Sequence, residues 1–337
     1  MQLRSFGKTG IEVSEVCLGT MAFGAGVAPG DARRICDAFF DRGGNFVDAA
    51  NTFAAGESER ILGDVLRDRR DRVVVSTKFG RTTDPGDPTA CGNDRHNLRR
   101  SLEASLTRLG TDHVDVLWAH AWDPSTPPEE LAAGLDEALR SGKTRAIGIA
   151  DAPAWGITRV HGLMEALGSR IDGVLLEYGL AARDAERELL PMTDALDMTP
   201  LAWGTLSGDL LLGDPESVKQ RRESSGDYYT RVRAEAAQRV HGILHTITTA
   251  RGESASPAAV ALAWIRATQP RVIPVLGPTT EAELHDRLRS VAITLGPAEV
   301  DALGACSAID LGFPSEYLRD PGVLREIYGD AAAIRAR

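Results

Sequence analysis

Three titratable side chains of complementary type stand at or just after the ends of apolar runs in this 337-residue chain: Asp48, Lys78 and His120. An aspartate beside a lysine keeps the ammonium group charged and oriented, and a histidine exchanges protons near neutral pH. If the fold brings the three groups to one point, they can move protons on a bound small molecule. The rest of the sequence must then supply elements that place them together.

A repeating unit runs through the chain, made of a short apolar run, a polar turn and an amphipathic helix. The apolar runs are residues 16–20, 45–48, 72–78, 114–118, 145–149, 173–176, 199–203 and 272–276. Each is apolar at nearly every position, which is typical of a parallel strand covered on both faces. Eight units without a break in composition predict a closed (β/α)₈ barrel, a TIM barrel, as a single domain over residues 1–337. A doubly wound sheet is less favoured, because no GxGxxG follows the first run.

Barrel enzymes place their functional residues at the carboxyl ends of the strands, so Asp48, Lys78 and His120 are predicted to converge there. Three additions to the barrel are expected. An N-terminal β-hairpin surrounds the turn at residues 7–10, and a long loop at 204–231 follows the seventh strand as a cover over the site. The C-terminal tail at 310–337 lacks a strand pattern and is expected to fold across the same barrel mouth.

The composition excludes several functional classes. Asp and Glu number 48 against 38 Lys and Arg, and this net charge of −10 gives no electrostatic reason to bind nucleic acid or an anionic membrane. No apolar run reaches the roughly 18 residues of a membrane span, and the first residues do not resemble a secretory signal. The cysteines are scattered without a CxxC pair, so no metal site is predicted. We expect a cytoplasmic protein with a small-molecule substrate, and a homo-oligomer is compatible with this composition.

Seven short motifs follow one another along the chain: LGTM at 18–21, NFVDAA at 45–50, GESERILG at 56–63, STK at 76–78, SLxRLGxDxxD at 105–115, ERELLPM at 186–192 and IPVLG at 273–277. In this order they resemble the aldo-keto reductase superfamily over nearly the whole chain, in the style of the branch that includes potassium-channel β subunits and deoxysugar ketoreductases. The resemblance implies an oxidoreductase that reduces a carbonyl group with NADPH. By analogy, its substrate is a carbonyl-bearing molecule such as one of secondary metabolism.

The resemblance also assigns catalytic roles. The family's aspartate, lysine and histidine fall on Asp48, Lys78 and His120, where the Asp–Lys pair would acidify a tyrosine that protonates the substrate oxygen. That tyrosine belongs five residues after the aspartate, and the position holds Phe53. Phenylalanine has no proton to donate, and the loss of a positioned general acid typically costs ~10²–10⁴ in rate.

The family's contacts to the nicotinamide carboxamide are altered as well. They correspond here to Ala150, Asp151 and Leu175, of which only Asp151 can still accept a hydrogen bond from the carboxamide. Trp203 keeps the aromatic ring that stacks on the nicotinamide. The other positions that the resemblance assigns to the cofactor at this end are Gly19, Thr20, Met21 and Leu206.

The positions that would bind the adenosine 2′-phosphate read Thr279, Glu283 and Arg287, while Gly277 still permits close approach of the backbone to a phosphate. A carboxylate at Glu283 disfavours a phosphate dianion but can bind a free ribose hydroxyl. These residues favour NAD over NADP, or the loss of the cofactor altogether.

Three functions remain open at this point. The first is a divergent oxidoreductase that uses Asp48, Lys78 and His120 without the tyrosine and binds NADP or NAD through weakened contacts. In this function His120, or a water held by Lys78, acts as the acid. The second is a non-redox lyase, dehydratase or cyclase on the same barrel, which would turn over without nucleotide. The third is a non-catalytic sensor or partner subunit. Aromatic residues near the strand ends form either a pocket wall or part of the core: Phe23, Trp118, Trp122 and Trp155.

Overall fold

Eight parallel strands close into a barrel in the computed structural model, which describes residues 1–213, 216 and 228–329. Each strand pairs with its neighbours along the chain, and β10 closes the barrel by pairing with both β9 and β3. The predicted TIM barrel is therefore confirmed. The strands are β3 (Cys17–Gly19), β4 (Phe46–Asp48), β5 (Val74–Phe79), β6 (Val114–His120), β7 (Thr144–Ala150), β8 (Gly173–Glu177), β9 (Thr199–Trp203) and β10 (Ile273–Leu276).

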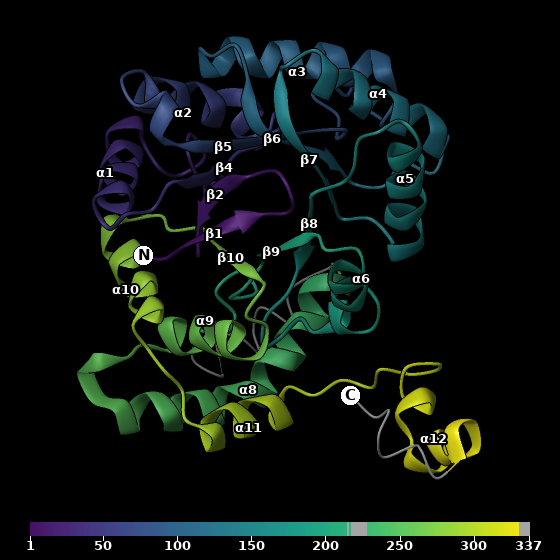
Figure 1. The fold of residues 1–337 in the computed structure, drawn as a ribbon. Helices are drawn as coiled ribbons and strands as arrows, with labels where there is room; N and C mark the ends of the chain where they lie inside the picture. The colour runs from purple at the N-terminus through teal and green to yellow at the C-terminus, as the bar shows by residue number, and fades with distance from the viewer. Residues whose placement is uncertain (214–215, 217–227, 330–337) are drawn as a thin grey trace.

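Helices lie between most of these strands and after the last one, and all but α12 lie around the barrel in Figure 1. They are α1 (Pro29–Asp41), α2 (Glu57–Leu66), α3 (Arg95–Leu109), α4 (Pro128–Arg140), α5 (Ala154–Ala166), α6 (Leu189–Ala195), α8 (Tyr228–Arg251), α9 (Pro257–Thr268), α10 (Glu281–Leu288), α11 (Pro297–Cys306) and α12 (Pro321–Tyr328). The helix α3 shows how the sequence sets their ends. Asp94 caps it by accepting a hydrogen bond from the His96 N–H at 2.8 Å, and Gly110 ends it with φ 64°. None of the described helices combines the length and the apolar character that a membrane crossing needs.

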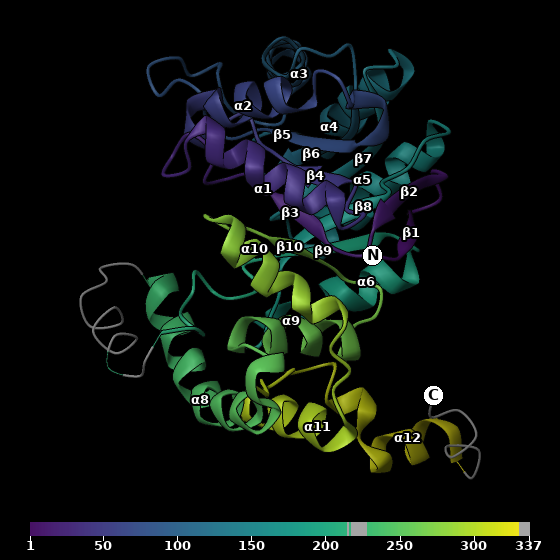
Figure 2. The same cartoon turned by 90° about the vertical axis from the view of Figure 1, so that its left-hand side faces the viewer.

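The predicted N-terminal hairpin is confirmed, with β1 (Leu3–Phe6) and β2 (Ile11–Ser14) paired antiparallel. It lies across the amino end of the barrel, which we call the base; the hairpin stands at the right in Figure 2. Phe6 is fully buried there, and its ring meets Phe46 and Trp118 edge-on at centroid distances of 6.0 and 6.1 Å. Apolar side chains therefore seal the base.

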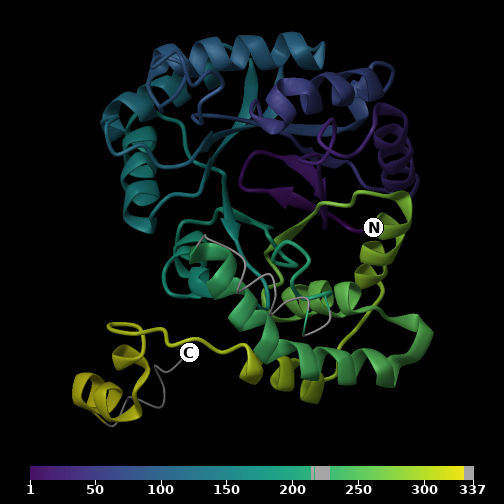
Figure 3. The ribbon, with the colours of Figure 1, turned by 180° about the vertical axis from the view of Figure 1, so that it is seen from behind.

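The opposite end, which we call the mouth, is formed by the carboxyl ends of the barrel strands and faces the reader in Figure 3. The strand β6 runs two residues further than predicted, because its last residues pair with Ile149 and Ala150 of β7. His120 is thus the last residue of its strand, as Asp48 is, and Lys78 is the last but one of β5. The three predicted residues stand at the ends of three neighbouring strands.

Strand register decides that these residues point to the same side. Asp48 lies opposite Ser76 and Lys78 opposite Trp118. Each site residue therefore lies two positions further along than the partner of the preceding one. Because side chains repeat with a period of two along a strand, this stagger keeps Asp48, Lys78 and His120 on the inner face of the barrel.

The segment after β9 is the long connection that the sequence predicts, and α8 begins at Tyr228, four residues earlier than expected. Its expected role as a cover falls in part on residues 214–215 and 217–227, which lie outside the described part of the chain. The start of α8 is held at the mouth, because Arg233 donates to Glu177 at the end of β8 at 2.7 Å and pairs with Asp184 at 3.0 Å.

The prediction that the C-terminal tail crosses the mouth is wrong for the residues described. In Figure 3, α12 projects outward from the barrel instead of lying over it, and none of its residues is buried. Two arginines that precede α6 bind the end of α11 and the start of the tail. Arg183 donates to the carbonyl of Gly304 in α11 at 2.8 Å, and Arg187 donates to that of Asp310 at 2.9 Å. These bonds tie the tail to the connection between β8 and α6.

Candidate active site

A buried ion pair between Asp48 and Lys78 occupies the mouth. One oxygen of Asp48 accepts a hydrogen bond from Lys78 Nζ, and the other accepts one from Ser76 Oγ at 2.6 Å. Lys78 Nζ also donates to the carbonyl of Ala49 at 2.7 Å. Both residues of the pair are only 3% exposed, so each charge depends on the other for compensation. The structure therefore brings these two predicted residues together.

Phe53 lies next to this pair. Its ring centroid is 5.0 Å from Lys78 Nζ, within the range of a cation–π contact. The ring is placed by a tight turn in which Ala54 and Ala55 adopt left-handed conformations with φ 48° and 54°. Alanine rarely adopts such angles, and residues held in them cluster at functional sites. The position for which the resemblance implies a tyrosine thus presents an aromatic ring to the lysine, without a hydroxyl group.

His120 lies next to Asp151, a residue that the resemblance assigns to the nicotinamide carboxamide. His120 Nε2 lies 3.4 Å from Asp151 Oδ2, and the other oxygen of Asp151 accepts a hydrogen bond from Trp203 Nε1 at 2.9 Å. Burial lowers the pKa of His120, and the Asp151 carboxylate opposes that shift, whereas the cations Lys78 and Arg81 add to it. His120 stands two residues beyond Trp118, the register partner of Lys78, so its side chain lies on the same inner face of the barrel as the Asp48–Lys78 pair. The three predicted catalytic residues are therefore at the ends of three neighbouring strands of the mouth.

The residues assigned to the nicotinamide end lie on neighbouring parts of the mouth. Gly19 ends β3 and Thr20 follows it; the Thr20 hydroxyl is fully buried against the carbonyl of Asp48 at 3.1 Å and the Ser58 hydroxyl at 2.8 Å. The Thr20 N–H donates to the carbonyl of Asp48 and the Thr20 carbonyl accepts from Ser58, so the backbone of Thr20 is also engaged within the protein. Met21 follows with a side chain that is 68% exposed.

Leu206, Ala150 and Leu175 are buried apolar residues of the same end of the barrel. Ala150 and Leu175 pair in register on β7 and β8, and neither side chain carries a polar atom for a carboxamide. Among the positions assigned to the carboxamide, only Asp151 has polar side-chain atoms, and those already contact Trp203 and His120.

The residues assigned to the adenosine end contact one another. Glu283 accepts hydrogen bonds from the Thr279 N–H at 2.8 Å and from the Thr279 hydroxyl at 3.0 Å. Arg287 is 5% exposed and pairs with Glu283 at 3.2 Å and with Asp209 at 3.5 Å. Beside them, nothing lies within 4 Å of the place where a Cβ on Gly277 would stand. The Glu283 carboxylate therefore accepts from the Thr279 N–H, which could otherwise bind a phosphate. The Arg287 guanidinium is paired with the carboxylates of Glu283 and Asp209.

Asn51 is a candidate site residue that sequence analysis missed. It lies between Asp48 and Phe53 and is 2% exposed, yet both polar atoms of its carboxamide lack a hydrogen-bond partner among the described residues. A buried amide without partners is costly, and such groups recur at binding sites. Its spacing of three residues after Asp48 was the only signal in the sequence.

Two tryptophans form an aromatic wall beside the mouth. Trp122 follows β6 and Trp155 lies in the first turn of α5, with ring centroids 5.2 Å apart and nearly perpendicular planes. Trp155 is 61% exposed, and the Trp122 N–H donates to the carbonyl of Asp151 at 3.2 Å. Phe23 and Trp118, by contrast, are fully buried in the core. Only the Trp122–Trp155 pair is therefore in a position to contact a ligand.

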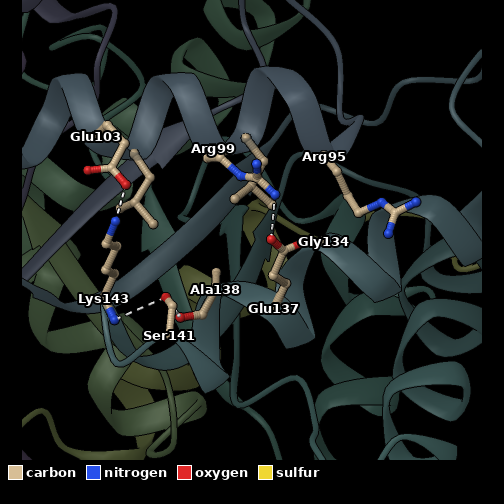
Figure 4. Close-up of a pocket in the computed structure, with 10 residues that line it drawn as sticks. Arg95, Arg99, Glu103, Gly134, Glu137, Ala138, Ser141 and Lys143 are labelled. Carbon is tan, nitrogen blue, oxygen red and sulfur yellow. Dashed lines mark hydrogen bonds and ion pairs between the residues drawn. The ribbon is translucent and has the colours of Figure 1, made fainter.

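A separate small cavity lies on the outside of the barrel between α3 and α4 (Figure 4). Ion pairs line it: Arg99 pairs with Glu137 at 2.6 Å, and Lys143 pairs with Glu103. Lys143 comes just before β7, so this cavity opens toward the base and is not part of the mouth. The charges that line it compensate each other, which is typical of a solvated helix face.

Comparisons with known proteins agree with this geometry. Residues 15–308 match the aldo/keto reductase family. Norsolorinic acid reductase stcV of Emericella nidulans is 33% identical over 92% of this chain and 82% of its own length. An uncharacterized oxidoreductase of Bacillus subtilis, YrpG, is 34% identical over 88% of this chain and 92% of its own. An aryl-alcohol dehydrogenase of Pestalotiopsis microspora, GME11368, is 31% identical over 94% and 84%. The chain therefore belongs to the aldo/keto reductase family and is an oxidoreductase of that family.

Proposed function

We propose that this protein interconverts a carbonyl group and an alcohol on an aromatic small molecule, with NAD(H) as the preferred cofactor. The observation that carries the proposal is the convergence of Asp48, Lys78 and His120 at the ends of consecutive strands of a barrel of this family. Such a group of residues can bind a carbonyl oxygen and move a proton at it. The bound nicotinamide would supply or accept the hydride.

The preference for NAD(H) rests on the adenosine end. Glu283 places a carboxylate on the Thr279 N–H, and Arg287 is already paired with Glu283 and Asp209. A 2′-phosphate would meet like charge at this point, and like-charge contacts cost several kcal/mol. A ribose hydroxyl can instead donate to the Glu283 carboxylate. The residues present therefore fit an unphosphorylated dinucleotide.

The Asp48–Lys78 pair has an orienting role in this proposal. Two of the three Lys78 N–H donors are used by Asp48 and by the carbonyl of Ala49, and the Phe53 ring lies over the ammonium group. The Lys78 ammonium group would thus be held in place as a fixed positive potential where negative charge develops on the substrate oxygen. Phe53 stands in place of the family's tyrosine, so the proton has to come from another group.

The aromatic class of substrate is supported by the tryptophan wall. Trp155 is 61% exposed next to Trp122, and aromatic rings prefer edge-to-face or offset contacts with other rings. One relative is described as an aryl-alcohol dehydrogenase, which agrees with a flat aromatic ligand. An aliphatic carbonyl compound would make fewer such contacts.

Steady-state kinetics with NADH and NADPH test the proposal, using aryl aldehydes and ketones against aliphatic ones of similar size. We expect kcat/KM with NADH to exceed that with NADPH by about tenfold or more, and aryl substrates to exceed aliphatic ones. The variant Thr279→Arg/Glu283→Gln should reverse the nucleotide preference, with Glu281→Gln on the same helix as the control. Turnover that needs no nucleotide would contradict the proposal and favour a non-redox reaction.

A further inference from the structure

We propose that His120 and Asp151 act as a proton-donating dyad: Asp151 stabilises the charged imidazole, and His120 Nε2 protonates the substrate oxygen. This inference rests on the proposed function, and it names the group that replaces the missing phenol. It also reassigns Asp151, which the family resemblance places at the carboxamide, to the chemistry of the proton.

Geometry selects His120 as the donor. Lys78 directs two of its three N–H donors to Asp48 and to the carbonyl of Ala49, and Phe53 has no proton to give. The imidazole of His120 stands at the end of the next strand, two residues beyond Trp118, the register partner of Lys78. His120 is the titratable group of this cluster whose protons are not bound within the Asp48–Lys78 pair.

The backbone and side-chain contacts of Asp151 place its carboxylate next to the His120 imidazole. Its backbone has φ 53°, a left-handed angle that aspartate and asparagine tolerate better than most residues. The carboxylate is fixed on one side by Trp203 Nε1 at 2.9 Å, and its other oxygen reaches His120 Nε2 at 3.4 Å. The backbone N–H of Trp122 donates to the backbone carbonyl of Asp151 at 3.2 Å. One side-chain hydrogen bond and one backbone hydrogen bond thus hold Asp151 with a carboxylate oxygen toward the histidine.

The charges around His120 make Asp151 necessary. Lys78 on β5 and Arg81 just after it both disfavour a charged imidazole, as does burial, and Asp151 after β7 is the anion that opposes them. His120 Nδ1 is buried and lacks a partner among the described residues, so it adds nothing to hold the charge. Without the Asp151 carboxylate, the ring would remain neutral over a wider range of pH.

In the proposed reduction, a bound reduced nicotinamide would supply the hydride that forms the C–H bond at the carbonyl carbon and would itself be oxidised. The N–H bond at His120 Nε2 breaks, and its proton forms the O–H bond of the alcohol. His120 becomes neutral and regains a proton from solvent. In the oxidative direction the neutral imidazole accepts the proton that leaves the alcohol.

The isosteric variant Asp151→Asn tests the dyad, because an amide keeps the left-handed backbone and the oxygen that accepts from Trp203 but removes the charge. We expect NMR of ¹³C-labelled histidine in the free protein to show the pKa of His120 lowered in this variant, with its resonance assigned by loss in His120→Gln. Glu165→Gln is the matched control. It removes the carboxylate 3.5 Å from another buried histidine, His161, and should leave the His120 titration unchanged.

The pH dependence of turnover provides the second readout. Carbonyl reduction by the wild type should fall as pH rises through the pKa of His120, and in Asp151→Asn this decline should begin at lower pH. Each unit by which the pKa falls costs about tenfold in the charged fraction at higher pH. His120→Gln should lose ~10²–10⁴ in kcat for reduction.

A phenol introduced by Phe53→Tyr should make the loss caused by Asp151→Asn smaller, because a second donor is then available. If the wild type reduces carbonyls but Asp151→Asn keeps both the His120 titration and the pH profile, the dyad is wrong and the proposed reaction stands. A shifted His120 titration in a protein that turns over no substrate with either nucleotide would instead refute the proposed reaction, and with it the donor role.

Discussion

The two ends of the barrel differ in what they bury: apolar rings at the base and charged groups at the mouth. At the base, the hairpin buries Phe6 against Phe46 and Trp118, and Gly148 gives the indole room, since a Cβ there would lie 2.1 Å from it. At the mouth, the same inner face carries charged and polar groups, among them the buried Asp48–Lys78 pair. The base is packed for stability, whereas the mouth holds groups that would be unfavourable without one another.

This contrast separates two kinds of burial. Apolar side chains at the base stabilise the fold by leaving water, at roughly 25 cal/mol per Å² of apolar surface. Buried charges at the mouth contribute little net stability, because the loss of hydration offsets their attraction. Changes at the base should therefore lower stability more than activity, and changes at the mouth should lower activity whatever they do to stability.

The largest effect is expected at the mouth for Lys78→Met. This change leaves Asp48 as an uncompensated buried charge and should cost about 3–5 kcal/mol of unfolding free energy, together with most of the activity. The double variant Asp48→Asn/Lys78→Met removes both charges and should recover much of that stability while remaining inactive. Urea denaturation and steady-state kinetics measure the two quantities. A double variant as unstable as Lys78→Met would show that the uncompensated charge of Asp48 is not the cause of the lost stability.

At the base, Phe6→Ala should cost about 3–5 kcal/mol by removing a fully buried ring. The folded fraction should keep a kcat close to that of the wild type, because the hairpin lies at the end opposite the site. Leu3→Ala, at a position 53% exposed on the same hairpin, is the control and should change stability by about 0.5 kcal/mol or less. A strong loss of kcat in folded Phe6→Ala would show that the two ends are coupled.

Asp172 is a buried carboxyl group near the base, just before β8. Its titration tests whether a buried charge at this end of the barrel lowers the stability of the fold. Burial raises the pKa of Asp172 from 3.8 to about 6, against the opposing effect of the Ile147 N–H. Because the folded pKa is the higher one, the favourable contribution of the protonated acid is complete below about pH 3.8 and is lost as pH rises through 6. Asp172→Asn should therefore stabilise the protein at pH 8, by up to about 3 kcal/mol, and much less at pH 4. Urea midpoints at the two pH values measure this, and equal gains at both would be contrary to expectation.

The smallest effect is expected for Ala54→Gly in the turn that places Phe53. A left-handed alanine costs about 1–2 kcal/mol, and the added freedom of glycine in the unfolded chain offsets part of the gain. We expect stabilisation of up to about 1 kcal/mol by urea denaturation. Ala54→Val should act in the opposite direction, since a β-branched residue fits φ 48° poorly. Destabilisation by the glycine would mean that the turn is not strained.

Periodicity in the sequence was sufficient to predict the barrel, the hairpin and the three strand-end residues. Apolar runs of strand length alternating with amphipathic helices are local features, and Asp48, Lys78 and His120 end up together because parallel strands share one end. The tail was mispredicted because its course depends on Arg183 and Arg187, which lie more than a hundred residues before it and bind its backbone. No local pattern reports such a contact.

The sequence by itself determined which residue types are present at the mouth, including a phenylalanine where the family resemblance implies a tyrosine and an aspartate at a position that the resemblance assigns to the nicotinamide carboxamide. Only the tertiary structure decided what the aspartate contacts. The pairing of Asp151 with His120 and Trp203 depends on a left-handed backbone angle and on the stagger of three strands that lie far apart in the chain. Hydrogen bonds form within about 3 Å, and distances of that size between separate strands are fixed by packing and register rather than by residue order.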